Sequence, residues 1–257
     1  MTGIVDAGRR CSLRVSKRTG EEAASPDRVA DRLLEIYQRL YDHFGPLRWW
    51  PAETPLEVIT GAVLTQNTAW TNVEKAIANL KQAGPLTREA LLAMPVEELA
   101  RLIRPSGYYN VKAVRLRALL EWLGEGWEQG LATGDFDALR EDLLRVRGVG
   151  AETADSILLY AANRATFVID AYTRRVLQRL GIEPGAQAPS PAPGGPAWGY
   201  EHYRRLFMDH LPHEPALFNE FHAQIVYLGK DYCRKQPRCG GCPLRDLCPT
   251  GSAAERM

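Results

Sequence analysis

The sequence predicts an all-α protein, and three observations lead to this fold class. Apolar residues recur every three or four positions through most of the chain, as on the buried face of a helix. No run of alternating apolar and polar residues is long enough to form a sheet. At 257 residues with 45% hydrophobic content, the chain can bury one large core or two modest ones.

Composition limits the class of partner. The formal net charge is only +1, so a nucleic-acid footprint must be local rather than global. No apolar run approaches the length that spans a membrane, and no signal-peptide segment follows the first residues. We therefore expect a cytoplasmic protein, associated with the nucleoid in a prokaryote, that has no membrane partner.

The chain is expected to begin with a disordered extension. Residues 1–26 are polar and rich in arginine, so a solvated tail is the favoured interpretation and a weak DNA-tethering arm the alternative. Cys11 lies in this tail, remote from the other cysteines, and receives no role. The first helix is expected over residues 27–44, with Gly45 as its C-terminal stop.

Trp49 and Trp50 follow this helix in an extended segment, because Pro51 disfavours the helical conformation for the residue before it. Two adjacent tryptophans in such a segment point in different directions. Large aromatic side chains usually pack in a core. The alternative is the aromatic wall of a pocket, on which a nucleobase stacks.

The next helix is expected over residues 55–64, with Thr54 as its cap and Pro55 in its first turn. It ends in the polar residues Gln66 and Asn67. Further helices are expected over residues 71–82, 87–94, 96–103 and 110–123. Between two of them, residues 104–112 combine small residues and two tyrosines with Lys112, which suits a contact with a DNA backbone.

A glycine turn of four residues then joins two helices, expected over residues 136–145 and 151–162. The turn consists of Arg147, Gly148, Val149 and Gly150. Its two glycines can adopt positive φ and allow another backbone to come close. Because free N–H groups and the positive end of the helix dipole point outward together at a helix start, this turn is a candidate phosphate site.

Asp170 follows a short hydrophobic run, residues 166–169, and directly precedes a helix expected over residues 171–180. A helix N-cap is a common position for Asp and is sufficient to explain this residue by itself. Residues 183–196 are rich in Pro, Ala and Gly and predict a loop. Two further helices are expected over residues 198–211 and 214–231; His222 lies in the second, where a core hydrogen bond is the favoured role.

Four closely spaced cysteines follow the last of these helices: Cys233, Cys239, Cys242 and Cys248. In a cytoplasmic protein such closely spaced cysteines indicate a metal site rather than disulfides. Zinc bound by four thiolates and a [4Fe-4S] cluster are both compatible with this spacing.

Together these motifs resemble the helix-hairpin-helix DNA glycosylases of the endonuclease III superfamily. The resemblance rests on the Gly-Val-Gly hairpin, on Thr153 and Ala154 after it, and on Val168-Ile169-Asp170 followed by Arg174. It implies a monomer with a two-lobed helical fold, whose partner is double-stranded DNA containing a damaged base. The implied domains are a six-helix barrel at residues 55–164 and an iron-sulfur cluster domain at residues 27–54 and 165–257. In this family the matching aspartate assists cleavage of the N-glycosidic bond, so Asp170 is expected to be catalytic as well as a cap.

A closer resemblance is to the branch of this superfamily that removes 3-methyladenine. It is carried by residues 49–51, 64–68 and 106–110. In this family a glutamine matching Gln66 fills the gap left by the everted base. The resemblance implies a base pocket that includes Trp49, Trp50, Glu152 and Lys230, and a cationic alkylated purine is expected to stack between the two indole faces.

Glu152 stands where bifunctional members of the superfamily carry a lysine that attacks the sugar. A carboxylate cannot form the imine that permits strand cleavage, so we expect weak or absent lyase activity. The family also carries a [4Fe-4S] cluster with nearly this cysteine spacing, which implies the same cofactor here. Gln224 replaces a modified pocket lysine of the branch, so the pocket floor is expected to differ.

Two alternatives stay open. One is an endonuclease III-like glycosylase and lyase that acts on oxidised pyrimidines, or on mismatched or deaminated bases. The other is a non-catalytic DNA-binding module. The presence of Asp170 argues against the module, because a pure binder needs only the hairpin.

Overall fold

The computed structural model describes residues 26–47, 49–183 and 199–253. The expected N-terminal extension with Cys11 and nearly all of the loop at 183–196 lie outside these residues. Every regular element in the described part of the chain is helical, which confirms the all-α class. None of the described helices has the length and hydrophobicity needed to cross a membrane.

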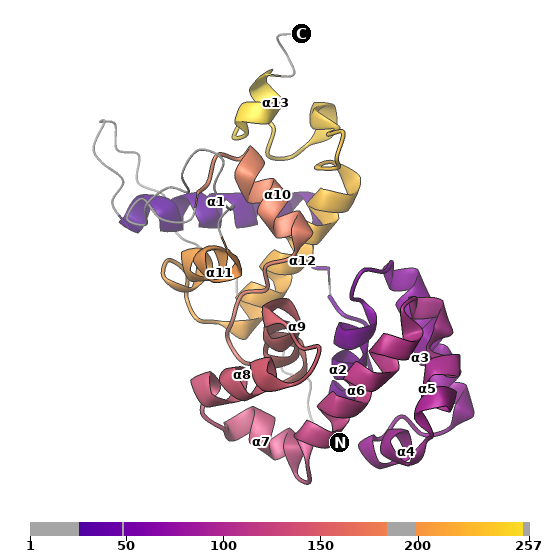
Figure 1. The fold of residues 1–257 in the computed structure, drawn as a ribbon. Coiled ribbons are helices and arrows are strands. Elements are labelled where there is room, and N and C mark those ends of the chain that lie inside the picture. Colours follow the sequence, from indigo (N-terminus) through magenta and orange to yellow (C-terminus); the bar gives the residue numbers. More distant parts are fainter. Residues whose placement is uncertain (1–25, 48, 184–198, 254–257) are drawn as a thin grey trace, which may run out of the picture.

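Two groups of helices form two lobes (Figure 1). The first lobe contains α2 (Pro55–Leu64), α3 (Trp70–Ala83), α4 (Arg88–Ala93), α5 (Val96–Leu102), the short 3-10 helix η1 (Arg104–Ser106), α6 (Tyr109–Leu123), α7 (Trp127–Thr133), α8 (Phe136–Arg145) and α9 (Ala151–Ser156). The second contains α1 (Pro26–Phe44), α10 (Ala171–Arg179), α11 (Tyr200–Met208), α12 (Pro215–Asp231), the 3-10 helix η3 (Cys239–Gly241) and α13 (Pro249–Ala253). Each lobe has its own cluster of buried apolar residues.

The first lobe is built around α2, in which every residue after Pro55 is buried. Thr54 caps this helix as the sequence predicts, since its hydroxyl accepts a hydrogen bond from the Glu57 N–H at 3.2 Å. Gly61 faces the rings of Trp50 and Trp70, and a Cβ at this position would lie 3.3 Å from the Trp50 ring. A helix enclosed on all sides can therefore serve as a fixed support for the segments at its ends.

The helix expected over residues 151–162 is regular only in its first half. It continues as the π-helix η2 (Ile157–Ala161), in which the Ala162 N–H donates to the Ile157 carbonyl at 3.1 Å. Leu158 belongs to the core of the first lobe and Leu159 to the core of the second, so η2 connects the two lobes. Inserted π turns of this kind often occur at functional sites.

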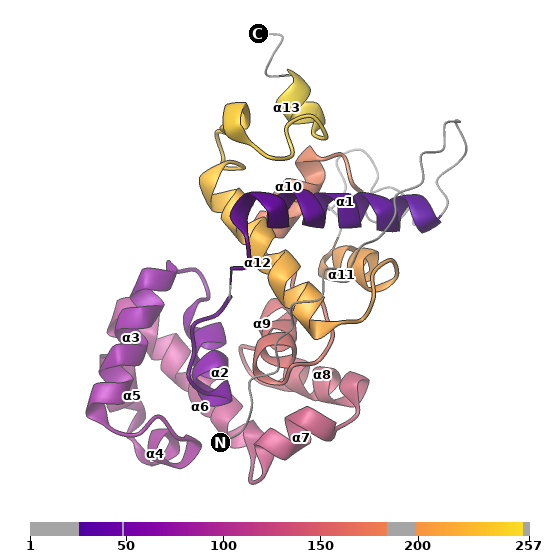
Figure 2. The ribbon, with the colours of Figure 1, turned by 180° about the vertical axis from the view of Figure 1, so that it is seen from behind.

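In the second lobe α12 is the central element. It packs against α1, α10 and η2, and both views show it extending from the cysteine segment beside α13 down to the first lobe (Figures 1 and 2). We propose η2 and α12 as the boundary between the two predicted domains. The sequence did not predict α7 or α13, which are short helices of seven and five residues.

Candidate active site and DNA interface

Asp170 lies where the two lobes meet, at the N-terminus of α10. The preceding residues Phe167, Val168 and Ile169 are buried and fix the path of the chain. The Thr173 N–H donates to Asp170 Oδ1 at 2.7 Å, which confirms the predicted N-cap. Its side chain remains 15% exposed, so the carboxylate is held in place and still accessible.

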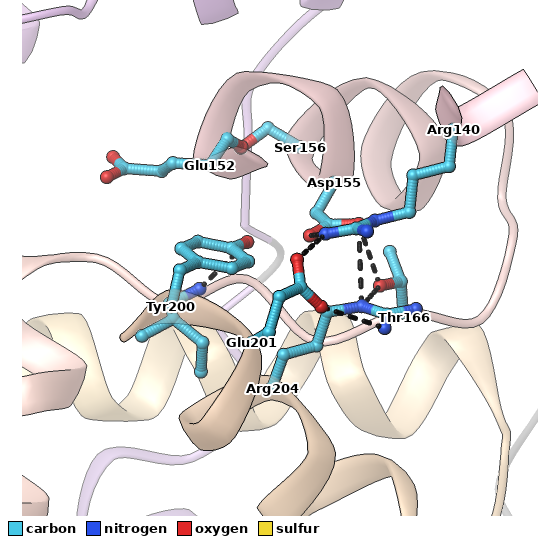
Figure 3. Close-up of polar contacts among 9 residues, drawn as sticks. Arg140, Glu152, Asp155, Ser156, Thr166, Tyr200, Glu201 and Arg204 are labelled. Carbon is cyan, nitrogen blue, oxygen red and sulfur yellow. Dashed lines mark hydrogen bonds and ion pairs between the residues drawn. The ribbon is translucent and has the colours of Figure 1, made fainter. Parts of the chain in front are cut away.

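Glu152 is the second carboxyl group of this region and lies in the first turn of α9. Part of its side chain is exposed to solvent. Partial burial, and then the charge of Asp170, raise the pKa of its carboxyl to about 7, while Arg174 opposes this shift. Its carboxylate points away from Asp155 and Arg140, which lie on the other side of α9 (Figure 3). Two carboxyl groups near each other, one of them titrating close to neutral pH, are typical of glycosidic bond chemistry.

The two tryptophans lie beside this site, but their geometry does not allow the expected stacking of a base between their faces. Their rings are 6.3 Å apart and inclined by 79°, so a flat base cannot be sandwiched between the two indole faces. Trp50 adopts φ 68° and stacks on Tyr160 with ring centroids 5.0 Å apart. The ammonium group of Lys230 lies over the Trp49 ring at 5.5 Å. The predicted sandwich is therefore wrong, although Trp49, Trp50 and Lys230 lie close together.

The hairpin between α8 and α9 differs in one detail from the expectation. Gly148 has φ +86°, and a Cβ there would collide with the Arg115 side chain, so glycine is required. Gly150 instead has an extended backbone, with φ −97°. Val149 is buried, and its N–H donates to the Val146 carbonyl at 3.0 Å. Within the described residues the amides of Gly148 and Gly150 have no such partner, which leaves them for phosphate oxygens.

Gln66 reaches back to this hairpin. Its amide nitrogen donates to the Gly148 carbonyl at 3.1 Å and to Thr153 Oγ1 at 3.0 Å. Its amide oxygen accepts from Arg115 at 2.5 Å. Asn67, the next residue, is exposed with φ 53°. Sequence reasoning missed Arg115, which no motif distinguishes from other helix-surface arginines.

A cavity of about 310 Å³ opens beside this contact. It is lined by Asn110, Val111, Val114, Arg115, Arg147 and Gly148. The exposed arginine of the hairpin therefore borders a concave surface between α6 and the hairpin.

Lys112 does not belong to this surface, so the prediction that it contacts DNA is wrong. The side chain is 2% exposed and its ammonium donates to the Leu64 carbonyl at 2.9 Å and the Ser106 carbonyl at 2.6 Å. Burial and the nearby Arg115 lower its pKa to about 8. Lys112 therefore joins the end of α2 to η1 and is not available to phosphates.

A buried polar cluster on the other side of α9 was not predicted (Figure 3). Asp155, with 0% exposure, accepts two hydrogen bonds from Arg140 at 2.8 and 3.0 Å and one from Thr166 at 3.0 Å. Arg140 also pairs with Glu201 of α11, and Arg204 of the same helix donates to Thr166 at 2.9 Å. The cluster thus ties the helix-hairpin-helix unit to the second lobe. Its members are too far apart in sequence to form a recognisable motif.

The four cysteines are free thiols and partly buried. Burial raises the pKa of the Cys242 thiol to about 11, and the charges of Cys233, Cys248 and Cys239 act in the same direction. The Arg179 guanidinium lies 3.2 Å from Cys233 Sγ. Four thiols beside a cation fit the donor set of an iron-sulfur cluster. In the described part of the chain no group of three or more His, Cys, Asp or Glu side chains is arranged to hold a metal ion.

Gln224 is buried and does not line an open pocket floor. Its amide nitrogen donates to the Gly45 carbonyl at 2.7 Å and to Glu220 at 2.5 Å. It therefore connects α12 to the end of α1.

Comparison with known proteins agrees with this geometry. Residues 60–192 match the HhH-GPD superfamily of base excision DNA repair proteins. A protein of Methanocaldococcus jannaschii described as a candidate DNA repair glycosylase is 41% identical, over 85% of this chain and 96% of its own length.

Two solved structures share the fold. A non-covalent endonuclease III–DNA complex superposes with a TM-score of 0.70 at 23% identity, over 89% of this chain and 99% of that one. The 3-methyladenine DNA glycosylase of H. pylori bound to 1,N6-ethenoadenine superposes with a TM-score of 0.63 at 28% identity, over 80% of this chain and 98% of that one. The two-lobed endonuclease III-like fold is thus confirmed.

Proposed function

Since the chain belongs to the HhH-GPD superfamily of base excision DNA repair proteins, we propose that it is a monofunctional DNA N-glycosylase. It hydrolyses the bond between a damaged base and its deoxyribose and leaves the strand intact. The observation that carries this proposal is the position of Asp170, whose carboxylate is held by the Thr173 N–H at 2.7 Å and stays 15% exposed where the lobes meet, on the side of α9 that carries Glu152.

Asp170 supplies the catalytic charge. Breaking a glycosidic bond builds positive charge on the sugar, so a fixed carboxylate beside C1′ stabilises the transition state more than the ground state. The hydrogen bond from Thr173 holds one oxygen of Asp170 and leaves the other to face the sugar or a water molecule. A water oriented by this carboxylate completes the hydrolysis.

Glu152 supports the monofunctional character. Cleavage through an imine needs an amine nucleophile, which a carboxyl group cannot provide. Lys112 is enclosed by two carbonyls, and the Lys230 ammonium lies over the Trp49 ring. Neither lysine is presented as a free nucleophile.

DNA is bound by the hairpin and by the segment after α2. The Gly148 and Gly150 amides suit phosphate oxygens of the strand that carries the damaged base. Gln66 and Asn67 are proposed to enter the space that this base leaves. For Gln66 this requires release of its contacts with Arg115 and the hairpin.

Our first candidate substrate is an alkylated purine such as 3-methyladenine. A base that carries a positive charge is attracted to Glu152 and Asp170 and needs no acid to leave. The second candidate is a neutral mismatched or deaminated pyrimidine. It is favoured by Lys230, because an ammonium already over Trp49 disfavours a cation at that ring.

The four cysteines are proposed to bind a [4Fe-4S] cluster. The four thiolates would hold the cluster, which would cross-link the C-terminal segment and stabilise its packing beside α10 and α12. Arg179 supports this arrangement, because it bonds Cys233 Sγ and also the carbonyls of Arg234 and Lys235 at 2.6 and 2.9 Å. The exposed residues of this loop, Arg234, Lys235 and Arg238, are available to further phosphates.

The test is base release from duplexes that contain 3-methyladenine, 1,N6-ethenoadenine, uracil or thymine opposite guanine, or thymine glycol. Release of one class without strand nicking supports the proposal and identifies the substrate. Release coupled to nicking contradicts the monofunctional mechanism. No release from any duplex, with DNA binding intact, moves support to the binding module.

Glu152→Lys tests the role of the carboxyl group separately. We expect the introduced amine to give strand nicking and a borohydride-trapped covalent complex, which the wild-type protein does not give. Glu152→Gln is the matched control, since it removes the charge without adding an amine. If the wild type is trapped as efficiently as Glu152→Lys, another amine acts and Glu152 does not decide the mechanism.

A further inference from the structure

His222 is a buried residue of α12 with one ring nitrogen that has no partner among the described residues. Its exposure is 4%, and its Nδ1 lies 2.6 Å from the Tyr160 hydroxyl. Its Nε2 has no hydrogen bond there, although Asp170 Oδ2 lies 3.8 Å away. A buried polar group without a partner is rare and needs an explanation. Here the group faces the proposed catalytic carboxylate.

The charge of Asp170 decides which nitrogen of His222 carries the proton. Burial lowers the pKa of His222, and Asp170 only partly opposes this, so the ring is neutral near neutral pH. A neutral imidazole has one N–H and one lone pair. Opposite a carboxylate oxygen an N–H is attracted and a lone pair is repelled. The proton therefore resides on Nε2.

Tyr160 completes this arrangement from η2. With the proton on Nε2, Nδ1 is an acceptor, and the Tyr160 hydroxyl donates to it. Burial, and then the charge of Asp170, hold the pKa of Tyr160 well above its ordinary value, so the phenol keeps the proton that it donates. Glu152 adds to this shift from the other side of the site.

We propose that His222 is a positioning residue for Asp170, with Tyr160 fixing the tautomer that presents Nε2–H to Asp170 Oδ2. The separation of 3.8 Å is too long for a hydrogen bond. Such contacts are often long in a free enzyme and shorten in the complex with substrate. Thr173 already holds Oδ1, so a bond to Oδ2 fixes the plane of the carboxylate. This inference rests on the proposed catalytic role of Asp170.

His222 and Tyr160 both contact the tryptophans beside the site. The His222 ring lies 6.0 Å from the Trp49 ring at 72°, and Tyr160 stacks on Trp50. A base that packs against these indoles presses on the same two side chains that orient Asp170. Substrate binding is thereby coupled to shortening of the contact between His222 and Asp170.

Two variants of nearly equal size separate positioning from packing. In His222→Gln the amide nitrogen can replace Nε2, whereas in His222→Asn the shorter amide reaches only the position of Nδ1. We expect His222→Asn to lower the single-turnover rate of base release about 10- to 100-fold, and His222→Gln to restore most of it.

The matched control is His213→Gln, since His213 is exposed and its Nε2 lies 2.7 Å from the Met208 carbonyl, away from Asp170. Wild-type single-turnover rates in His222→Asn would overturn the proposal. Equal losses in His222→Gln and His222→Asn, with equally lowered melting temperatures, would also overturn it, because they indicate packing alone.

Nitrogen NMR of the wild-type protein tests the same inference without any activity. We expect His222 to carry its proton on Nε2 at neutral pH, and Asp170→Asn or Tyr160→Phe to shift the tautomer equilibrium. An Nδ1-protonated ring, or a tautomer that neither variant changes, overturns the proposal whatever base the protein releases. A protein that releases no base but shows the expected tautomer contradicts the proposed function and leaves this arrangement intact.

Discussion

Glu152 and Asp155 lie three residues apart in α9, yet their carboxyl groups have opposite surroundings (Figure 3). Asp155 is completely buried and bonded to Arg140 and Thr166. Glu152 is exposed, points away from this cluster and has a pKa raised to about 7. A buried carboxylate bonded to cations serves the structure, whereas a more exposed carboxyl group beside a second one, with a pKa near neutral, is poised for chemistry.

The difference follows from the charges that each side chain meets. Asp155 faces the junction of α8 and α11, where arginines from both lobes supply its charge partners. Glu152 faces Asp170, and Arg174 only partly offsets that like charge. The same short helix therefore holds the lobes together on one side and lines the proposed reaction site on the other.

The largest expected effect on stability comes from breaking the buried ion pair between Asp155 and Arg140. Asp155→Asn leaves Arg140 buried without its main partner, so we expect the free energy of unfolding to fall by about 3–5 kcal/mol. Asp142→Asn is the control, because Asp142 pairs with Arg145 on the exposed surface, and its loss should cost less than about 1 kcal/mol. Urea unfolding of both variants measures the difference. Equal effects would mean that the buried cluster does not hold the lobes together.

Lys112 is a buried cation whose partners are two backbone carbonyls. Lys112→Met leaves the Leu64 and Ser106 carbonyls without their donor, so we expect a loss of about 1–3 kcal/mol. Lys75→Met, at an exposed position of α3, should change stability far less. Chemical unfolding measures both. A Lys112→Met protein with wild-type stability but weakened DNA binding would restore the original expectation of a phosphate contact.

The smallest expected effect on stability concerns Glu152 and depends on pH. The pKa of Glu152 is raised in the folded state from 4.5 to about 7, so between these values the folded protein binds more protons than the unfolded chain. Stability contributed by this group is present below about pH 4.5 and lost as the pH rises to about 7. Glu152→Gln should therefore gain melting temperature relative to the wild type across this interval. A difference between the two proteins that does not change with pH contradicts the raised pKa of Glu152.

Features that depend on neighbouring residues could be predicted from the sequence. The Thr54 and Asp170 caps, the hairpin with Gly148 and most helices follow from local preferences of a few adjacent residues. The Asp170 cap was predicted from the hydrophobic run before it, and the structure has this arrangement.

Features set by contacts distant in sequence could not be predicted. Lys112 has the composition of a surface lysine, and only the approach of α2 and η1 buries it. A cationic purine was expected to stack between the faces of Trp49 and Trp50, but the contacts of Trp50 with Gly61 and Tyr160 hold its ring at a steep angle to Trp49. The Asp155 cluster joins residues from Arg140 to Arg204, and no local spacing signals it.

The most direct test of the central contrast is to measure Asp170→Asn and Asp155→Asn side by side, as single-turnover base release per folded molecule together with the melting temperature. We expect Asp170→Asn to lose about 10²- to 10⁴-fold in rate with a nearly unchanged melting temperature, since Asn also caps a helix. Asp155→Asn should lose melting temperature and keep near wild-type release while folded. Comparable release by Asp170→Asn and the wild type, or an inactive but fully folded Asp155→Asn, would contradict this division of roles.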